Sequence, residues 1–518
     1  MNFRFSLVLS SMSVALVSGA GELVPLPRWC KFTGAEHVFA VKRVADIPRT
    51  ETTDADVPRE GYRLTVSSNG VSVVSSDDTG AFYALKTLEQ LADKTDGGFA
   101  VRGVEIQDHP SYPWRGVLID EGRHFFGQRV VQRVIDLMAE HKLNILHWHL
   151  TEDQGWRLDV PGFPELVKYG SVRSQSPRPG SPWHCNAKGI RIMQMDGVRY
   201  GPFFYTEQEV RDVIAYAAER HIMVVPEIEL PGHVAALLAA HPEFACCPEN
   251  VAKRDPRVVW GIENEVLCVG NDEAIAFFEK VLDWVCRTFP APYVHIGGDE
   301  CPTLRWEKCP KCLARVKAEK MSGVKDLQPW LTRRIVKFLE ARGKRVVGWQ
   351  AVLEGDAPKS LIGIGHGGQA RRRDGTLQPA AEGAVKGHDI ISCPSHLTYY
   401  YDGQGLDDPF QYGESGQPFG GGKLTLEKAY SFNPLRGVPF EARGHVLGSE
   451  SCNWSEYTWN EHDLAWKMWP RTCAMAEILW LGEDKPVYSD FISRMKGHRR
   501  RLIAAGVNCA PLGPGAEW

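Results

Sequence analysis

The chain has 518 residues, of which 43% are hydrophobic and 24% are charged, a balance typical of globular proteins. Its net charge of −4 gives no reason to expect nucleic acid or an anionic membrane as a partner. The length exceeds that of one small domain and is enough for a large barrel with an accessory module.

The first residues are typical of an export signal. Arg4 supplies a positive charge, residues 5–17 are apolar, and Ser18-Gly19-Ala20 forms a small-residue cleavage site. A membrane anchor is the alternative, but the apolar run is short for a membrane span, and no later stretch would suit one. We therefore expect residues 1–20 to be a signal peptide and the mature protein to be periplasmic or secreted.

Residues 21–108 indicate a small α+β domain. Two runs, at 62–66 and 71–74, alternate apolar and polar residues as half-buried strands do. Apolar residues at helical spacing then predict a helix over residues 80–91. The segment 108–113 contains two prolines and is typical of a linker between two domains.

From residue 114 onward, strand-like apolar runs alternate with amphipathic helices. The runs lie at 116–119, 144–150, 223–228, 293–296, 345–349, 361–364, 389–392 and 445–448. Helices are expected at 130–142, 207–220, 272–288 and 331–342. Strands that alternate with helices in this way are typical of the α/β class, here a (β/α)8 TIM barrel over residues 109–490. A doubly wound sheet is the alternative, but no glycine-rich nucleotide loop follows a strand. Residues 491–518 are expected to form a tail packed on the barrel.

Polar and aromatic residues cluster where these strands end, which is where barrel enzymes place their chemistry. The most informative segment is His295-Ile296-Gly297-Gly298-Asp299-Glu300. Its two glycines allow a close approach of backbone or ligand, and two carboxylates follow directly. We interpret the pair as catalytic, the alternative being a helix N-cap.

Thirteen cysteines allow several arrangements. Cys309 and Cys312 have metal-like CxxC spacing, with Cys301 upstream, but a zinc site usually needs a second pair at similar spacing. The sequence therefore favours a local disulfide or free thiols over zinc. A disulfide from Cys246 or Cys247 to Cys268 is a further expectation.

Five segments in this order resemble the signature motifs of family 20 glycoside hydrolases, the exo-acting β-N-acetylhexosaminidases. They are residues 115–126, 144–156, 226–233, 295–300 and 453–456. The resemblance covers residues 61–480. It implies a small α+β domain followed by a (β/α)8 barrel, in agreement with the patterns above.

The resemblance also implies a mechanism. Glu300 would be the general acid that protonates the leaving oxygen and then the base toward water. Asp299 would orient the acetamide of the substrate, whose carbonyl attacks the anomeric carbon in place of an enzyme carboxylate. Tyr400 would donate to the acetamide oxygen. The expected course is a retaining, substrate-assisted one through an oxazolinium intermediate, an exception to the two-carboxylate scheme.

Further roles follow from the matched positions. Arg123 would hold the 3- and 4-hydroxyls of the terminal sugar, and Glu456 the 4- and 6-hydroxyls. The remaining expected residues are Trp349 and Trp454 as pocket walls, Asp402 at the far side of the sugar, Asp153 and His233 as a dyad that tunes the acid, and His149, Glu227 and His295 as scaffold. Each histidine could equally be a satisfied core residue. No metal and no cofactor are implied.

The chain departs from the family in one segment. Many members have a third tryptophan after the sixth strand, and here His366 stands near that position. The pocket would then be looser, or another aromatic residue would complete it. Arg371, Arg372 and Arg373 follow, either as a solvated basic loop or as a contact for an anionic glycan.

Three functions remain open on the sequence. The first is an exo-β-N-acetylhexosaminidase that acts on glycans ending in N-acetylhexosamine, either GlcNAc or GalNAc. The second is a lacto-N-biosidase that releases a disaccharide. The third is a catalytically silent carbohydrate-binding protein, against which the intact carboxylate pair argues.

Overall fold

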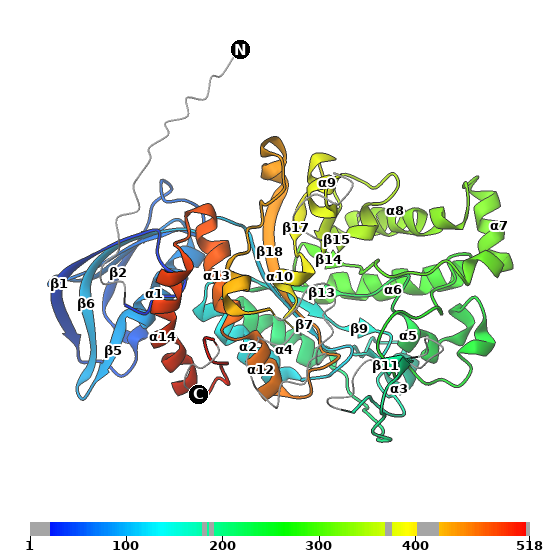
Figure 1. Cartoon of the computed structure of the whole chain (residues 1–518), viewed down its shortest axis with the longest axis horizontal. Helices are drawn as coiled ribbons and strands as arrows, with labels where there is room; N and C mark the ends of the chain where they lie inside the picture. The colour runs from blue at the N-terminus through cyan, green and yellow to red at the C-terminus, as the bar shows by residue number, and fades with distance from the viewer. Residues whose placement is uncertain (1–20, 179–183, 186–190, 368–375, 401–423, 514–518) are drawn as a thin grey trace, which may run out of the picture. The chain divides into compact units, whose positions relative to one another are not determined.

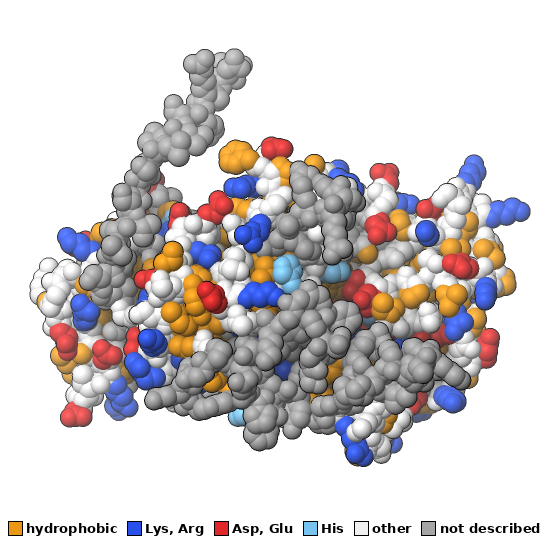
Figure 2. All heavy atoms as spheres, viewed as in Figure 1, with side chains coloured by type: hydrophobic (Ala, Val, Ile, Leu, Met, Phe, Trp, Pro, Cys, Tyr) orange, Lys and Arg blue, Asp and Glu red, His pale blue; other side chains and the backbone are white. Residues whose placement is uncertain are grey.

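The computed structural model describes residues 21–178, 184–185, 191–367, 376–400 and 424–513 (Figure 1). The chain forms two compact units, Met1–His109 and Pro110–Trp518. Within the described ranges, no helix has both the length and the apolar character needed to cross a membrane. On the face drawn in Figure 2, acidic and basic side chains are interspersed, in keeping with the small net charge.

The first unit is an α+β domain, as predicted. Its sheet has the order β1-β6-β3-β4-β2, with β5 paired to β6. The strands are β1 (Trp29–Phe39), β2 (Arg49–Thr53), β3 (Tyr62–Ser67), β4 (Gly70–Ser75), β5 (Ala92–Thr95) and β6 (Gly98–Asp108). Helix α1 (Asp78–Leu91) begins at Asp77, whose carboxylate accepts a hydrogen bond from the Gly80 N–H at 2.8 Å and so caps the helix.

The outer strands of this sheet are interrupted or polar. The pairing of β1 with β6 shifts register between Phe32 and Glu36, a bulge-like irregularity. Strand β2 reads Arg-Thr-Glu-Thr-Thr, and four of its five residues are exposed. The apolar residues lie instead on β3 and β4, whose side chains alternate between the core and solvent.

The second unit is built on a closed barrel of parallel strands, so the predicted (β/α)8 architecture is confirmed. The order around the barrel is β13-β14-β15-β16-β17-β18-β7-β8. The strands are β7 (Trp114–Asp120), β8 (Ile145–His149), β13 (Met223–Glu227), β14 (Tyr293–His295), β15 (Arg345–Trp349), β16 (Ile362–Gly365), β17 (Ile390–Ser392) and β18 (Val446–Asn453). Each coincides with one of the predicted apolar runs. Short pairs also form between β9 (Thr151–Glu152) and β10 (Gly155–Trp156), and between β11 (His184–Cys185) and β12 (Arg191–Ile192).

Helices surround the strands, and Figure 1 shows α6 and α8 side by side along the outside of the barrel. The longer ones are α2 (Gln128–Glu140), α4 (Glu207–Ala218), α6 (Asp272–Thr288), α8 (Leu327–Glu340), α13 (Arg471–Leu481) and α14 (Tyr488–Ala504). The shorter ones are α3 (Pro164–Gly170), α5 (Ala235–Ala240), α7 (Pro310–Ala318), α9 (Pro379–Val385), α10 (Ser395–Thr398), α11 (Leu426–Tyr430) and α12 (Glu461–Met468). Helix α14 is held to α13 by a buried ion pair between Arg494 and Glu477 at 2.7 Å.

The expected disulfide from Cys246 or Cys247 to Cys268 is wrong. All three cysteines are free thiols, and so are Cys309 and Cys312. The sulfurs of Cys246, Cys268, Cys309 and Cys312 nevertheless lie within 4.8 Å of one another.

Candidate active site

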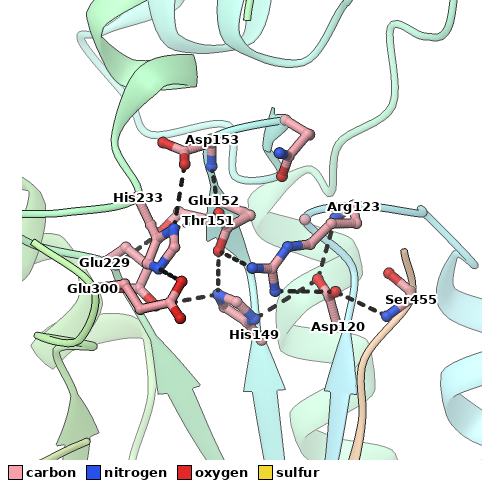
Figure 3. A network of polar contacts seen from close by, with 12 residues as sticks. Asp120, Arg123, His149, Thr151, Glu152, Asp153, Glu229, His233, Glu300 and Ser455 are labelled. Carbon is pink, nitrogen blue, oxygen red and sulfur yellow. Dashed lines mark hydrogen bonds and ion pairs between the residues drawn. The ribbon is translucent and has the colours of Figure 1, made fainter. Parts of the chain in front are cut away.

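The register of the barrel places four polar residues at one level. Asp120 at the end of β7 pairs with His149 of β8, His149 with Glu227 of β13, and Glu227 with His295 of β14. Because parallel strands end at the same face of a barrel, side chains from distant parts of the sequence meet there. Figure 3 shows two of these residues, Asp120 and His149, with the polar side chains that surround them near the ends of the strands.

The two glycines after β14 adopt backbone conformations that other residues rarely reach. Gly297 has φ +63° and Gly298 has φ +96°. A Cβ on Gly297 would lie 1.6 Å from Glu229 Oε2, and one on Gly298 would lie 2.4 Å from a methyl of Val352. These glycines let the chain pass close to its neighbours and bring Asp299 and Glu300 to the strand end.

We therefore expect Gly297→Ala to lower the free energy of unfolding by about 2 kcal/mol, since it adds backbone strain and a clash inside a packed site. Thermal unfolding measures the change. Gly323→Ala is the matched control, because that glycine has an extended backbone and no heavy atom within 4 Å of the added Cβ. Equal melting temperatures for the two variants would contradict the prediction.

Asp299 and Glu300 lie in different environments despite their adjacency. Burial, with repulsion from Glu300 and Glu227, raises the pKa of Asp299 to about 7, although His233 opposes the shift. The side chain of Glu300 is 47% exposed, and its Oε2 lies 3.7 Å from His233 Nε2. Asp299 is thus the enclosed member of the pair and Glu300 the member open to a ligand.

His233 links the exposed carboxylate to two buried ones. Its Nδ1 lies 2.9 Å from Glu152 Oε1 and 3.2 Å from Asp153 Oδ2 (Figure 3). Burial lowers the pKa of His233, but the two carboxylates outweigh it and hold the pKa well above its usual value. The structure therefore brings Asp153 and His233 together, and it places the protonated His233 ring beside Glu300.

Arg123 is the cationic centre on the other side of the network. Its guanidinium lies 3.1 Å from Glu152 and 3.3 Å from Asp120, and 5.1 Å from the centroid of the Trp454 ring. Burial raises the pKa of Glu152, yet Arg123 and His233 outweigh it and lower the pKa to about 2. Glu152 and Asp120 thus hold Arg123 in place, although the sequence predicted no role for them. Their position at the ends of strands was the one sequence feature that pointed to a role in the site.

A group of aromatic residues packs near Arg123 and Glu227. Trp349 and Trp454 pack with ring centroids 5.5 Å apart, and His366 lies 5.8 Å from Trp349. Tyr399 contacts Trp454 at 5.7 Å. His366, at the position where the third tryptophan was missing, is therefore part of the same aromatic wall.

Tyr400 does not pack with these aromatic residues. Its side chain is 1% exposed, and its hydroxyl donates to the Arg471 carbonyl at 3.1 Å. The neighbouring residue Tyr399 packs instead against the cluster that contains Trp349 and Trp454. Asp402 lies outside the described residues, as do Arg371, Arg372 and Arg373.

Glu227 is a fully buried carboxylate at the end of β13. It accepts a hydrogen bond from Trp349 Nε1 at 2.8 Å and lies 2.7 Å from His295 Nδ1 and 3.0 Å from His147 Nε2. Burial opposes ionisation, but nearby His149 and His295 outweigh it and lower the pKa of Glu227 well below its usual value. These contacts hold the Trp349 indole and the His295 ring against the same buried carboxylate.

Several buried polar atoms of the predicted site residues and of His366 have no hydrogen-bond partner among the described residues. They are Asp299 Oδ1, Glu456 Oε2, Trp454 Nε1 and His366 Nδ1. Burial also raises the pKa of Glu456, although Arg123 opposes the shift. Since buried polar groups in proteins are nearly always paired, these atoms mark where a polar ligand would bind.

Comparisons with known proteins agree with this geometry. The family described as "Glycosyl hydrolase family 20, catalytic domain" matches residues 112–483, and "Glycosyl hydrolase family 20, domain 2" matches residues 23–109. A beta-hexosaminidase of Porphyromonas gingivalis is 35% identical over 465 residues, 88% of this chain and 55% of that protein. A beta-hexosaminidase of Akkermansia muciniphila is 34% identical over 461 residues, 87% of this chain and 86% of that protein.

Solved structures give the same result. An exo-β-N-acetylglucosaminidase of Vibrio harveyi has a TM-score of 0.81 at 28% identity, covering 95% of this chain and 79% of the other. A β-N-acetylhexosaminidase of Bacteroides fragilis has a TM-score of 0.77 at 26% identity, covering 94% of this chain and 97% of the other. This chain therefore belongs to glycosyl hydrolase family 20 and is a glycoside hydrolase.

Proposed function

We propose that this enzyme is a retaining exo-β-N-acetylhexosaminidase that removes terminal β-linked GlcNAc or GalNAc from glycans. The observation that carries the proposal is the set of unpartnered buried polar atoms around Asp299, Glu456 and the Trp349–Trp454 wall. A sugar with an acetamide group supplies matching hydrogen-bond partners, and its ring and methyl group suit the aromatic faces.

In the first step, the acetamide carbonyl oxygen of the substrate attacks the anomeric carbon while Glu300 gives its proton to the leaving oxygen. Asp299 accepts a hydrogen bond from the acetamide N–H and stabilises the positive charge that develops in the oxazolinium ion. In the second step, Glu300 takes a proton from water, which opens the oxazolinium ring. Two displacements at the same carbon retain its configuration.

The network around the pair supports these roles. His233, held by Glu152 and Asp153, presents a positive charge 3.7 Å from Glu300 and stabilises the carboxylate that forms when the proton leaves. Arg123, fixed by Glu152 and Asp120, offers forked donors to the sugar hydroxyls. Glu456 would accept from the hydroxyls on the same side.

We assign the acetamide donor to Tyr399 rather than to Tyr400. Tyr399→Phe should lower kcat by about 10-fold to 100-fold, because it removes a hydroxyl that aims the acetamide oxygen. Tyr400→Phe should leave kcat nearly unchanged and lower only the melting temperature, since its hydroxyl bonds to Arg471 inside the core. Steady-state kinetics and thermal unfolding of both variants decide the assignment, and the reverse pattern would restore Tyr400.

Release of p-nitrophenol from its β-GlcNAc, β-GalNAc and β-glucoside derivatives tests the function. Turnover of the N-acetyl sugars alone is the expected result, because only they carry the nucleophile. Comparable turnover of the glucoside would contradict a substrate-assisted route. Turnover of a lacto-N-bioside but not of the monosaccharides would favour the disaccharide-releasing alternative, and no turnover at all would favour a binding protein.

We further propose that the protein is exported, with residues 1–20 as the signal peptide. The positive charge of Arg4, the apolar run and the small residues up to Ala20 support this. Polymeric glycans outside the cytoplasm would then be its substrates. N-terminal sequencing of the protein from its native host tests the proposal, and an uncleaved chain would contradict it.

A further inference from the structure

Four cysteines from three separate segments of the barrel unit meet at one point. Cys246 and Cys268 lie at the two ends of the segment between α5 and α6. Cys309 directly precedes α7, and Cys312 lies in its first turn. The last three are at most 4% exposed, and Cys246 is partly buried. All four sulfurs lie within 4.8 Å of one another, and we refer to them as the four-cysteine cluster.

The sulfur separations have the geometry of a metal site. The Sγ atoms of Cys268 and Cys309 are 3.6 Å apart, those of Cys268 and Cys312 are 3.7 Å apart, and those of Cys246 and Cys312 are 3.7 Å apart. Zinc binds thiolates at about 2.3 Å in a tetrahedron, whose edges are then about 3.8 Å. We propose that the four-cysteine cluster binds a single zinc ion.

Disulfides account for the arrangement less well. A disulfide joins two sulfurs at about 2.05 Å and separates that pair from all others. Here Cys268 and Cys312 each have two sulfur neighbours at nearly equal distances. Shared, equal separations are what a common central ion requires, and a tetrahedral set of sulfurs is typical of zinc.

The surroundings are shaped for this contact. A Cβ on Gly270 would lie 2.3 Å from the backbone nitrogen of Cys312, so only glycine lets these two segments approach. Gly270 therefore lets the segment that carries Cys268 lie directly against the segment that carries Cys309 and Cys312.

The cluster also favours the negative charge that a zinc ligand must carry. Cys309 and Cys312 lie at the N-terminus of α7, whose dipole favours thiolates, and Lys308 and Lys311 add positive charge in the same segment. Binding converts four thiols into four thiolates, so up to four protons leave as zinc enters.

The site would position the catalytic loop. Asp299 and Glu300 stand between β14 and Cys309, so zinc fixes the chain shortly after the carboxylate pair. On the other side, Leu267 next to Cys268 donates to the Pro231 carbonyl at 2.9 Å, two residues before His233. The ion therefore ties together the two segments that carry Glu300 and His233, and its role is structural rather than catalytic.

Metal analysis of the full-length chain, purified without chelator from zinc-containing medium, tests the site directly. We expect close to one zinc per chain. Replacement by Co²⁺ should give the intense sulfur-to-metal charge transfer and visible bands of a tetrahedral tetrathiolate, a signature that a merely structural cysteine core would not give. Iron in place of zinc, or peptide mapping that finds disulfides among these cysteines, would overturn the proposal.

Paired variants separate this site from other thiols. Cys309→Ser/Cys312→Ser should lose the zinc, whereas Cys286→Ser should keep it, because Cys286 on α6 lies outside the cluster. Should the double variant fail to fold, Cys246→Ser alone should weaken zinc retention against a competing chelator, since Cys246 is the most accessible ligand. Full zinc content in every cluster variant would refute the assignment.

Discussion

Replacing Glu300 by glutamine is expected to lower kcat on natural glycans by about 10³-fold, because the general acid is lost while the fold is kept. The side chain is 47% exposed, and its Oε2 lies 3.7 Å from His233 Nε2. Its removal should therefore leave the melting temperature nearly unchanged. Steady-state kinetics and thermal unfolding of the same preparation give both quantities.

The leaving group makes this test specific. A dinitrophenyl leaving group departs without protonation. Glu300→Gln should therefore slow the first chemical step far less on a dinitrophenyl substrate than on a glycan. Glu354→Gln, an exposed carboxylate replaced in the same way, is the control and should keep full activity. An equal loss on activated and natural substrates would contradict the role of Glu300 as the acid.

Asp299→Asn is expected to lower kcat by about 10²-fold, because the amide cannot stabilise the positive charge of the oxazolinium ion. The pKa of Asp299 is raised by burial to about 7, so the free enzyme holds the required carboxylate only above that pH. In the wild type, kcat/KM should therefore fall as the pH drops below about 7. The residual kcat/KM of Asp299→Asn should not decrease below this pH. If the variant kept the wild-type pH profile, the decrease would have to come from another titrating group.

The raised pKa of Asp299 also predicts that Asp299→Asn is more stable than the wild type at alkaline pH. The pKa of Asp299 is 3.8 in the unfolded chain and about 7 in the fold, so between these values the folded state binds the extra proton. Wild-type stability is therefore lost as the pH rises through this window. Asparagine does not titrate, so Asp299→Asn should melt higher than wild type near pH 8, with the difference disappearing near pH 4. Thermal unfolding across this range measures it, and a lower melting temperature near pH 8 would contradict it.

The barrel could be predicted because each strand is encoded locally. Apolar runs such as 223–228 and 345–349 end in polar or aromatic residues, and parallel strands bring those ends together whatever their separation in sequence. The glycines at 297 and 298 provided a further local signal, since few other residues allow such turns. The contacts of Asp153 with His233 and of Glu227 with His295 follow from this shared level.

What the sequence could not decide depends on long-range geometry. Tyr399 and Tyr400 are consecutive, and adjacent side chains of an extended segment point to opposite sides, so only the path of the chain decides which one faces the pocket. The meeting of the four cysteines could not be predicted, because Cys246 and Cys268 come from separate segments and do not form a CxxC pair. The role of Glu152 could not be predicted, because the sequence does not show that Arg123 and His233 both contact it.

The outer strands of the small domain bear on how this protein behaves at high concentration. A sheet edge exposes unpaired N–H and C=O groups, and a flat apolar edge invites a neighbouring molecule to add a strand. Here β2 presents Arg49 and Glu51 on an exposed strand, and β1 is broken between Phe32 and Glu36. Both features discourage edge-to-edge aggregation, and the closed barrel has no strand edge to protect.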